Sequence, residues 1–300
     1  MYDIIVIGGG PAGLTAGIYA RRANKTVLVI EKDSFGGQIT FSPKVENIPG
    51  FSEVTGNEFA EKLVEQALSQ GVEFEYAEAT QIIDGPVKKV VTEGDSFEAK
   101  AIIIATGAKH RRLGLENEEK FIGDGISFCA VCDGAFFTGK TVAVIGGGNS
   151  ALQEAIQLSD LASKVFVVQN LPYLTGEAAL CRQVEARDNI TVILNHTVSE
   201  ILGDDVFKGI VIKDESDGRA RNLDLDGMFL AIGLLPQNEA FENVIELDSY
   251  GYADYNEALT GKTEGIFVAG DCRKKKIRQV VTAAADGASA ALFACDYIKI

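Results

Sequence analysis

The chain contains two copies of one strand–turn–helix unit, and this duplication limits the possible folds more than any other feature. In the first copy an apolar run leads into a turn in which Gly8, Gly10 and Gly13 follow the pattern G-x-G-x-x-G. The first glycine allows a tight turn, the second lets the backbone approach a pyrophosphate, and the third lets helix and strand pack closely. We expect a helix over about 12–23 whose N-terminus faces the phosphates of a dinucleotide.

The residues after this turn complete the pattern of a dinucleotide site. A second apolar strand over 26–30 ends in Glu31, and an acid at that point hydrogen-bonds ribose hydroxyls. Gly36-Gly37-Gln38 follows and is expected to let the backbone come close to a cofactor. Because strand, glycines, helix, strand and acid occur in this order, the first copy strongly indicates a dinucleotide site.

The second copy begins 138 residues later and is less complete. Gly146 and Gly148 repeat the first two glycines, and Ala151 takes the third place, where alanine is allowed by the motif. Gln169 stands where the first copy has Glu31. Two interpretations stay open: a second dinucleotide site, or a duplicated fold kept for packing after its function changed.

The segment 169–175 does not identify a nucleotide for the second copy. It reads Gln-Asn-Leu-Pro-Tyr-Leu-Thr, with neither the acid typical of an NAD site nor an arginine near a 2'-phosphate. Arginine would bind that phosphate bidentately. Gln169 can still hydrogen-bond a ribose hydroxyl, so NADH stays open, whereas the loss of arginines predicts weak use of NADPH.

Between the two copies lies a pair of cysteines that can close an exchangeable disulfide. Cys129 and Cys132 are separated by two residues, and Asp133 follows directly, where an acid can supply or take the proton of thiol chemistry. A bare C-x-x-C fits a redox pair or half of a zinc site. Zinc needs a second pair of ligands, and the remaining cysteines and the two histidines are scattered singly. We predict a redox pair and no metal site.

Composition narrows the class of protein. Three hundred residues, 46% of them hydrophobic, are enough for two domains with real cores. The net charge of −15 argues against nucleic-acid binding. No apolar run reaches the length of a membrane span. Five cysteines and an N-terminus without a basic leader are typical of a cytoplasmic protein.

Two further segments end apolar strands with glycine. Ala105-Thr106-Gly107 ends one strand, and Gly270-Asp271 ends another, shortly before an alanine-rich helix that opens after Arg278-Gln279. Asp271 could hold a ribityl hydroxyl or cap a turn. If both ends of the chain contact one cofactor, the first domain is discontinuous and the second copy is inserted in it.

Together these motifs resemble the low-molecular-weight thioredoxin reductases over nearly the whole chain. The resemblance rests on segments 8–13, 36–38, 45–50, 105–108, 129–134, 146–151, 270–271 and 278–279. It implies an α/β fold of two Rossmann-like three-layer dinucleotide-binding domains, the second inserted into the first. Residues 1–112 and 241–300 would bind FAD, residues 113–240 would form a nicotinamide-type domain with the C-x-x-C, and the protein would be a homodimer.

The resemblance also assigns residue roles. Cys132 would face the flavin, Cys129 would exchange with the substrate disulfide, Asp133 would be the acid/base, and rotation of the inserted domain would present the C-x-x-C to flavin and substrate in turn. The candidate FAD-binding residues are Gly8, Gly10, Pro11, Ala12, Gly13, Glu31, Lys32, Gly36, Gly37, Gln38, Asn47, Ala105, Thr106, Gly107, Gly270, Asp271, Arg278, Gln279 and Val280. The candidate nicotinamide-nucleotide residues are Gly146, Gly148, Asn149, Ser150, Ala151 and Gln169.

The implied activity is that of an FAD-dependent disulfide reductase. Electrons would pass from reduced FAD through Cys129–Cys132 to thioredoxin or a similar small redox protein. NADPH-using members carry H-R-R-x-x-x-R at 169–175, which this chain lacks, so we expect NADH, ferredoxin or another donor in place of NADPH. The alternatives are an NADPH-dependent thioredoxin reductase, a flavin reductase of a peroxidase system, and a redox-sensing flavoprotein without turnover.

Overall fold

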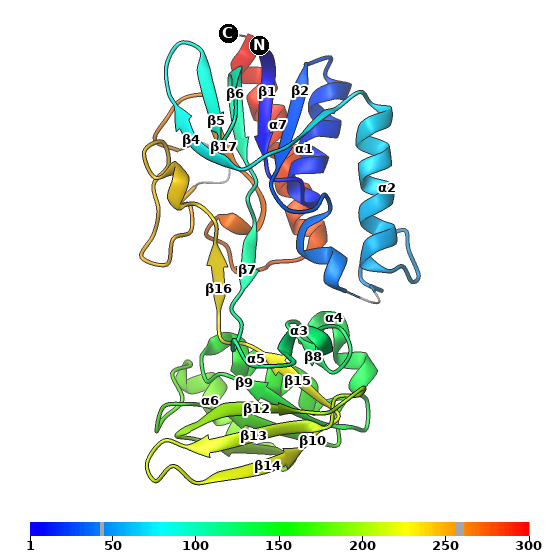
Figure 1. The fold of residues 1–300 in the computed structure, drawn as a ribbon, viewed down its shortest axis with the longest axis vertical. Coiled ribbons are helices and arrows are strands. Elements are labelled where there is room, and N and C mark those ends of the chain that lie inside the picture. Colours follow the sequence, from blue (N-terminus) through cyan, green and yellow to red (C-terminus); the bar gives the residue numbers. More distant parts are fainter. Residues whose placement is uncertain (43–44, 256–260, 300) are drawn as a thin grey trace. The chain divides into compact units, whose positions relative to one another are not determined.

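The protein is described by a computed structural model that covers residues 1–42, 45–255 and 261–299. The chain forms two compact units (Figure 1). The first contains Met1–Lys44, Ile48–Lys109 and Leu235–Ile300, and the second contains Val45–Asn47 and His110–Leu234. The connecting strands β7 (Ala108–His110) and β16 (Leu234–Pro236) pair with each other. The second unit is therefore an insertion in the sequence of the first.

A parallel sheet forms the centre of the first unit, with strand order β3-β2-β1-β6-β17. Its strands are β1 (Tyr2–Ile7), β2 (Val27–Glu31), β3 (Glu73–Tyr76), β6 (Ser96–Ile104) and β17 (Ile266–Val268). The beginning of β6 also pairs with an antiparallel hairpin of β4 (Ala79–Ile83) and β5 (Lys88–Thr92). The central strands are apolar along most of their length because both faces of the sheet are covered.

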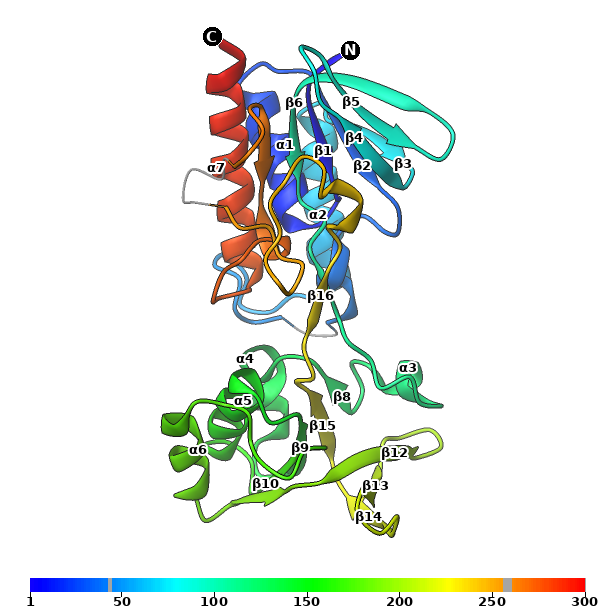
Figure 2. The same ribbon diagram turned by 90° about the vertical axis from the view of Figure 1, so that its left-hand side faces the viewer.

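Helices cover one face of this sheet. Helix α1 (Pro11–Arg22) and helix α7 (Val280–Lys299) lie side by side, and α2 (Gly56–Ser69) packs beside α1 (Figures 1 and 2). A Cβ at Gly287 would lie 2.0 Å from the carbonyl oxygen of Ala12, so the two helices approach by backbone. The other face packs against the hairpin and against later loops that contribute Phe241 and Tyr255. The result is three layers.

The second unit repeats the arrangement with a different outer layer. Its parallel sheet has the order β11-β10-β9-β15-β8. These strands are β8 (Ile126–Ser127), β9 (Thr141–Ile145), β10 (Lys164–Val168), β11 (Ile190–Ile193) and β15 (Gly227–Leu230). The remaining elements are α3 (Glu118–Phe121), α4 (Ala130–Asp133), α5 (Asn149–Ser159), α6 (Ala178–Glu185), β12 (His196–Leu202), β13 (Gly209–Asp214) and β14 (Ala220–Asp224).

Two cores cover the two faces of this second sheet. On one face, strand residues pack with Leu152 and Leu158 of α5 and Val184 of α6. On the other, they pack with Ile210 and Ile212 of the antiparallel sheet β12-β13-β14. The predicted α/β class with two Rossmann-like three-layer units is confirmed.

Short 3₁₀ helices complete the fold, at η1 (Gly37–Phe41), η2 (Gly134–Phe137), η3 (Glu239–Phe241) and η4 (Gly270–Cys272). The strand expected to end in Gly270-Asp271 is shorter: β17 ends at Val268, and both residues belong to η4. Within 1–42, 45–255 and 261–299, no helix is long and apolar enough to cross a membrane. The same residues contain no group of three or more His, Cys, Asp or Glu side chains placed to hold a metal ion.

Candidate active site

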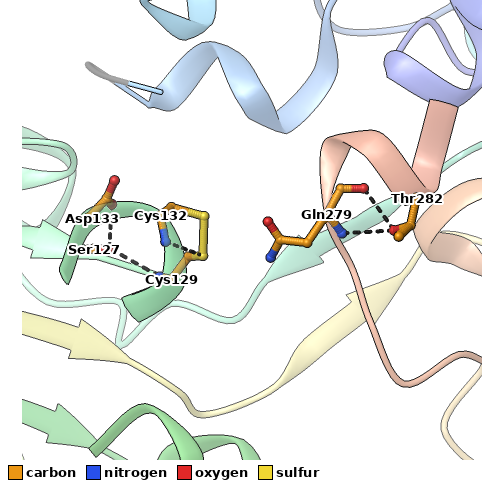
Figure 3. Close-up of a disulfide and its surroundings, with 6 residues drawn as sticks. All are labelled: Ser127, Cys129, Cys132, Asp133, Gln279 and Thr282. Atoms are coloured by element: carbon orange, nitrogen blue, oxygen red, sulfur yellow. Dashed lines mark hydrogen bonds between the residues drawn. A yellow bond between two sulfur atoms is a disulfide. The ribbon is translucent and has the colours of Figure 1, made fainter. Parts of the chain in front are cut away.

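The redox pair lies at the start of the short helix α4 of the second unit: Cys129 is the N-cap residue, and Cys132 belongs to the helix. Cys129 and Cys132 are joined by a disulfide with 5.3 Å between their Cα atoms. The backbone N–H of Cys132 donates to the Sγ of Cys129 at 3.2 Å (Figure 3). Both cysteines are half-buried, and Val131 between them is exposed. A hydrogen bond from a backbone N–H would favour the thiolate of Cys129 after reduction, and the thiolate is the nucleophile.

Asp133 ends the same helix and is held by one side chain. Its Oδ2 accepts a hydrogen bond from the Ser127 hydroxyl at 2.6 Å (Figure 3). Its Oδ1 is buried and has no hydrogen-bond partner among the described residues. Burial raises the pKa of this carboxyl above its ordinary value, and the bond from Ser127 opposes the rise. Burial therefore favours the protonated acid, as a proton donor needs.

Ser127 contacts both chemical groups, and the sequence analysis missed it. Its hydroxyl accepts a hydrogen bond from the backbone N–H of Cys129 at 3.1 Å while it donates to Asp133. Only 5% of Ser127 is exposed. In sequence, its only signal is its position two residues before the first cysteine.

The side chain before the redox pair is packed by aromatic and cationic groups. The ring of His110 stacks on Phe128 with 4.6 Å between centroids, and the Arg112 guanidinium lies 5.7 Å from the same ring centroid. Burial, with the nearby charge of Arg112, lowers the pKa of His110 to about 4. His110 is therefore neutral at pH 7 and packs as an aromatic ring beside the redox segment.

Glu154 is a second acid that sequence reasoning missed. It lies on α5, one turn before Leu158, and a Cβ at Gly134 would meet the side chains of Leu158 and Leu161. The side of α5 that carries Glu154 and Leu158 thus packs against Gly134, the residue after Asp133. The Oε2 of Glu154 is buried without a hydrogen-bond partner among the described residues, and burial raises its pKa to about 8. The carboxyl therefore stays largely protonated at neutral pH.

In the first unit the three motif glycines have different surroundings. Gly8 has φ +109°, and a Cβ there would lie 2.2 Å from the carbonyl oxygen of Ala105. A Cβ at Gly13 would lie 1.8 Å from the carbonyl oxygen of Gly8. A Cβ at Gly10 would meet nothing nearer than 4.0 Å. The first and third glycines are therefore required for packing, and the second leaves open space at the start of α1, as a bound pyrophosphate requires.

Glu31 lies over this turn. Its carboxylate accepts hydrogen bonds from the backbone N–H groups of Gly9 at 2.7 Å and Asp33 at 2.8 Å. The N–H of Gly36 in turn donates to the carbonyl of Gly9 at 2.8 Å. Since a carboxylate has about four acceptor sites, Glu31 retains acceptors for ribose hydroxyls.

The end of β17 reaches the same turn from the far end of the chain. Gly270 has φ +84°, and a Cβ there would lie 2.8 Å from the Cβ of Ala12. The Oδ1 of Asp271 is buried, and the Lys275 ammonium forms an ion pair with it at 3.1 Å. Burial raises the pKa of Asp271, and Lys275 opposes the rise. This buried acceptor fits a ribityl hydroxyl.

The start of α7 is also built locally. The hydroxyl of Thr282 accepts from the backbone N–H of Gln279 at 3.1 Å and donates to its carbonyl at 3.0 Å (Figure 3). The Arg278 guanidinium lies 4.3 Å from the centroid of the Tyr252 ring. Val280 begins the helix. These contacts fix the backbone that the sequence analysis assigned to FAD.

The other candidates in the first unit are placed less uniformly. The Thr106 hydroxyl donates to the Oδ1 of Asn238 at 3.0 Å, and a Cβ at Gly107 would meet nothing within 4 Å. Lys32 forms an ion pair with Glu78 at 2.7 Å. Pro11 and Gly37 flank the open position at Gly10, Gln38 is exposed, and Asn47 is grouped with the second unit.

The second glycine turn has the same backbone form. Gly146 has φ +129°, and a Cβ there would lie 2.5 Å from the carbonyl oxygen of Ala231. A Cβ at Gly147 would lie 2.6 Å from the amide group of Gln169, so this side chain lies over the turn. The nearest atom to a Cβ at Gly148 would be the Thr175 Oγ1, at 3.7 Å.

The polar groups of Gln169 are used within its own loop. Its Nε2 donates to the carbonyl of Tyr173 at 3.4 Å, and its Oε1 accepts from the N–H of Asn170 at 3.2 Å. Asn149 is bound to Glu177: its Nδ2 donates to the Glu177 carboxylate at 3.0 Å, and its Oδ1 accepts from the Glu177 N–H at 2.7 Å. An acid therefore stands beside the start of α5. Ser150 is exposed, and Ala151 is buried.

Comparison with known proteins defines the family. The family model described as pyridine nucleotide-disulphide oxidoreductase matches residues 2–287. The chain belongs to this family. It is 40% identical over 301 residues to the thioredoxin reductase of Bacillus subtilis strain 168, covering 100% of this chain and 95% of that protein. It is also 40% identical to the "34.2 kDa protein in rubredoxin operon" of Clostridium pasteurianum, covering 99% and 97%.

Solved structures agree with this family assignment. The crystal structure of thioredoxin reductase from Streptococcus pyogenes MGAS5005 matches with a TM-score of 0.95 and 38% identity, covering 100% of this chain and 98% of that one. The protein is thus a thioredoxin reductase-like oxidoreductase that acts on disulfides, and FAD is its cofactor. The open position at Gly10 and the buried acceptor of Asp271 fit FAD.

Proposed function

We propose that this enzyme reduces the disulfide of thioredoxin, or of a similar small redox protein, through Cys129 and Cys132. The observation that carries the proposal is the half-buried disulfide beside the buried acid Asp133. Curated relatives named thioredoxin reductase support it. We propose the cytoplasm as its location, from its cysteine usage, and a homodimer as its assembly, because the family resemblance implies one.

The residues that would hold FAD surround the first glycine turn. The backbone at Gly10 and the start of α1 would face the pyrophosphate, Glu31 the ribose, and Asp271 the ribityl chain. Bound FAD would supply the electron pair that reduces the Cys129–Cys132 disulfide. The carboxylate of Glu31 is negative and the N-terminus of α1 carries a positive partial charge. Together they would orient the dinucleotide.

The chain's own groups would then carry out disulfide exchange. The Cys129 thiolate attacks one sulfur of the substrate disulfide, forming a mixed disulfide and releasing the other substrate sulfur as a thiolate. Asp133 gives this leaving thiolate its proton. Cys132 then attacks the Sγ of Cys129, which re-forms the internal disulfide and releases the reduced substrate.

We propose that the electron donor is not NADPH. The loop 169–175 has no arginine to bind a 2'-phosphate. The carboxylate of Glu177, beside the start of α5, would repel such a phosphate. NADH, bound through Gln169, or a reduced iron–sulfur protein such as ferredoxin would replace it. The Clostridium relative in a rubredoxin operon favours a protein donor.

Anaerobic titration of the flavin enzyme tests the donor. We expect rapid bleaching of the flavin absorption by NADH or reduced ferredoxin, and slow bleaching by NADPH. Fast bleaching at micromolar NADPH would contradict the proposal and identify an NADPH-dependent thioredoxin reductase.

The Cys129→Ser variant tests the chemistry. We expect the variant to keep bound FAD and to lose thioredoxin reduction, because the attacking sulfur is gone. Cys181→Ser is the matched control, since Cys181 is a free cysteine of the same unit. Undiminished turnover in Cys129→Ser would reject the proposal.

The unaltered protein separates the alternative functions. Activity only with a peroxidase partner would favour a reductase of a peroxidase system. Bound FAD without turnover, under any electron donor, would favour a redox sensor.

A further inference from the structure

We propose that Ser127 is a positioning residue for the disulfide reaction, because its hydroxyl determines which oxygen of Asp133 carries the proton. The inference rests on the proposed role of Asp133 as the acid. Ser127 touches no reacting sulfur in the contacts described above. It would act through Asp133 and through the backbone of Cys129.

The Ser127 hydroxyl accepts one hydrogen bond and donates another. A serine hydroxyl has one proton and two acceptor lone pairs. It accepts from the backbone N–H of Cys129 at 3.1 Å. It donates its own proton to the Oδ2 of Asp133 at 2.6 Å. Because Ser127 is buried, water does not compete for either bond.

The two oxygens of Asp133 therefore differ. Because Oδ2 already accepts a hydrogen bond from Ser127, it is less suited than Oδ1 to carry the proton of the neutral acid. Oδ1 is buried and has no hydrogen-bond partner among the described residues. The proton of the neutral acid consequently resides on Oδ1, where it is not held by another acceptor and can be transferred to a thiolate.

The fold holds Ser127 at this place. Ser127 ends β8, where its register partner is Phe229 of β15. Only Phe128 separates it from Cys129, and Asp133 returns to it over one turn of α4. Ser127, Cys129 and Asp133 thus belong to one short segment of the second unit.

Removal of the hydroxyl should change the acid more than the fold. A hydrogen bond donated to a carboxylate stabilises its charged form, so its loss in Ser127→Ala should raise the pKa of Asp133 further. We expect the pH profile of thiol–disulfide exchange to move upward by about one unit. We also expect the rate at pH 7 to fall about tenfold, because the proton is no longer confined to Oδ1.

The test uses FAD-containing enzyme that is reduced with dithionite, so that no natural donor is needed. Reduced enzyme is mixed with oxidised thioredoxin between pH 5.5 and 9, and the single-turnover rate is measured. In parallel, the carboxyl of Asp133 is titrated by infrared difference spectroscopy, with Asp133→Asn to assign its band. Ser127→Thr keeps a hydroxyl and should restore both readouts. Ser199→Ala is the matched control, since its half-buried hydroxyl donates to the Val211 carbonyl, at 3.3 Å.

The outcomes separate the two proposals. An Asp133 pKa and a pH profile that are unchanged in folded Ser127→Ala would overturn the role of Ser127, as would a failure of Ser127→Thr to restore them. If the infrared pKa moves in Ser127→Ala but Asp133→Asn retains the unaltered pH profile, the positioning role stands and the proposed acid role of Asp133 fails. If Ser127→Ala does not fold, Ser127→Thr and Ser127→Cys give the comparison.

Discussion

The two glycine turns share a backbone and differ in what lies over it. In the first unit a charged Glu31 covers the turn and a second acid, Asp271, approaches from the end of β17. In the second unit a neutral Gln169 takes the place of Glu31, and its amide is bonded within its own loop. Backbone sterics thus preserve the turn, and a few side chains beyond it decide what the turn can bind.

The largest expected difference concerns the third position of the motif. In Gly13→Ala the new Cβ would lie 1.8 Å from the carbonyl oxygen of Gly8, whereas the second turn already has alanine, at Ala151. We expect Gly13→Ala to lose FAD and about 3 kcal/mol of unfolding free energy from overpacking. Flavin absorbance and chemical denaturation measure both. Ala151→Gly is the control and should cost about 1 kcal/mol from helix propensity.

The next effect concerns the missing cations of the second turn. Asn170 and Thr175 are exposed, so arginine at both positions would meet solvent without a change of the core. We expect the double variant Asn170→Arg/Thr175→Arg to bind NADPH about 10- to 100-fold more tightly, because charge-assisted bonds to phosphate are strong. Binding is measured by calorimetry, with NADH as the control ligand. Equal gains for NADH and NADPH would show that this loop does not bind a 2'-phosphate.

A smaller effect is expected when the acid of the first turn is converted to the side chain of the second. Glu31→Gln loses one carboxylate oxygen from its bonds to the N–H groups of Gly9 and Asp33. We expect FAD to dissociate about tenfold more readily, which is the effect of one lost charge-assisted bond. The reverse change, Gln169→Glu, should leave FAD affinity unaltered. A change of FAD affinity in Gln169→Glu equal to that in Glu31→Gln would remove the distinction between the turns.

The smallest effect concerns the helices behind the turns. Ala16 of α1 and Glu154 of α5 occupy equivalent places, since both lie eight residues after the first motif glycine. Burial raises the pKa of Glu154 from 4.5 to about 8 in the folded protein. Between those values the unfolded chain binds fewer protons than the folded protein, so this residue lowers stability as pH rises.

Glu154→Gln should remove that pH dependence. At pH 8 we expect the variant to be more stable than the unaltered protein, and at pH 4.5 to differ little, because the folded protein keeps this carboxyl protonated at the lower pH. Urea denaturation at several pH values measures the difference. Glu185→Gln, at the end of α6 in the same unit, is the control for the lost charge. A difference that is constant with pH would show that Glu154 is ionised in the folded protein.

The sequence predicted the fold well because glycine spacing and apolar strands are local signals. Helix α1 (Pro11–Arg22) and strand β2 (Val27–Glu31) lie within a few residues of the expected bounds, 12–23 and 26–30. The second unit's position in the middle of the chain was inferred from Gly270-Asp271, whose strand joins the first sheet.

Contacts between side chains could not be predicted in the same way. Ser127 and Glu154 carry no motif, and their importance comes from burial and from what they face in space. The basic segment 273–276 is held by ion pairs that no motif indicates, since Arg273 and Lys275 both bind Asp286 of α7. The roles of the site residues remain predictions that the variants above test.

The close packing of α1 against α7 has a consequence for synthesis on the ribosome. Helices α1 and α7 approach backbone to backbone at Ala12 and Gly287. The first unit therefore cannot complete its core until α7 has left the exit tunnel, by which time the second unit has already emerged and is free to fold. The second unit, which carries the disulfide, would fold first, and the first unit would complete its core last.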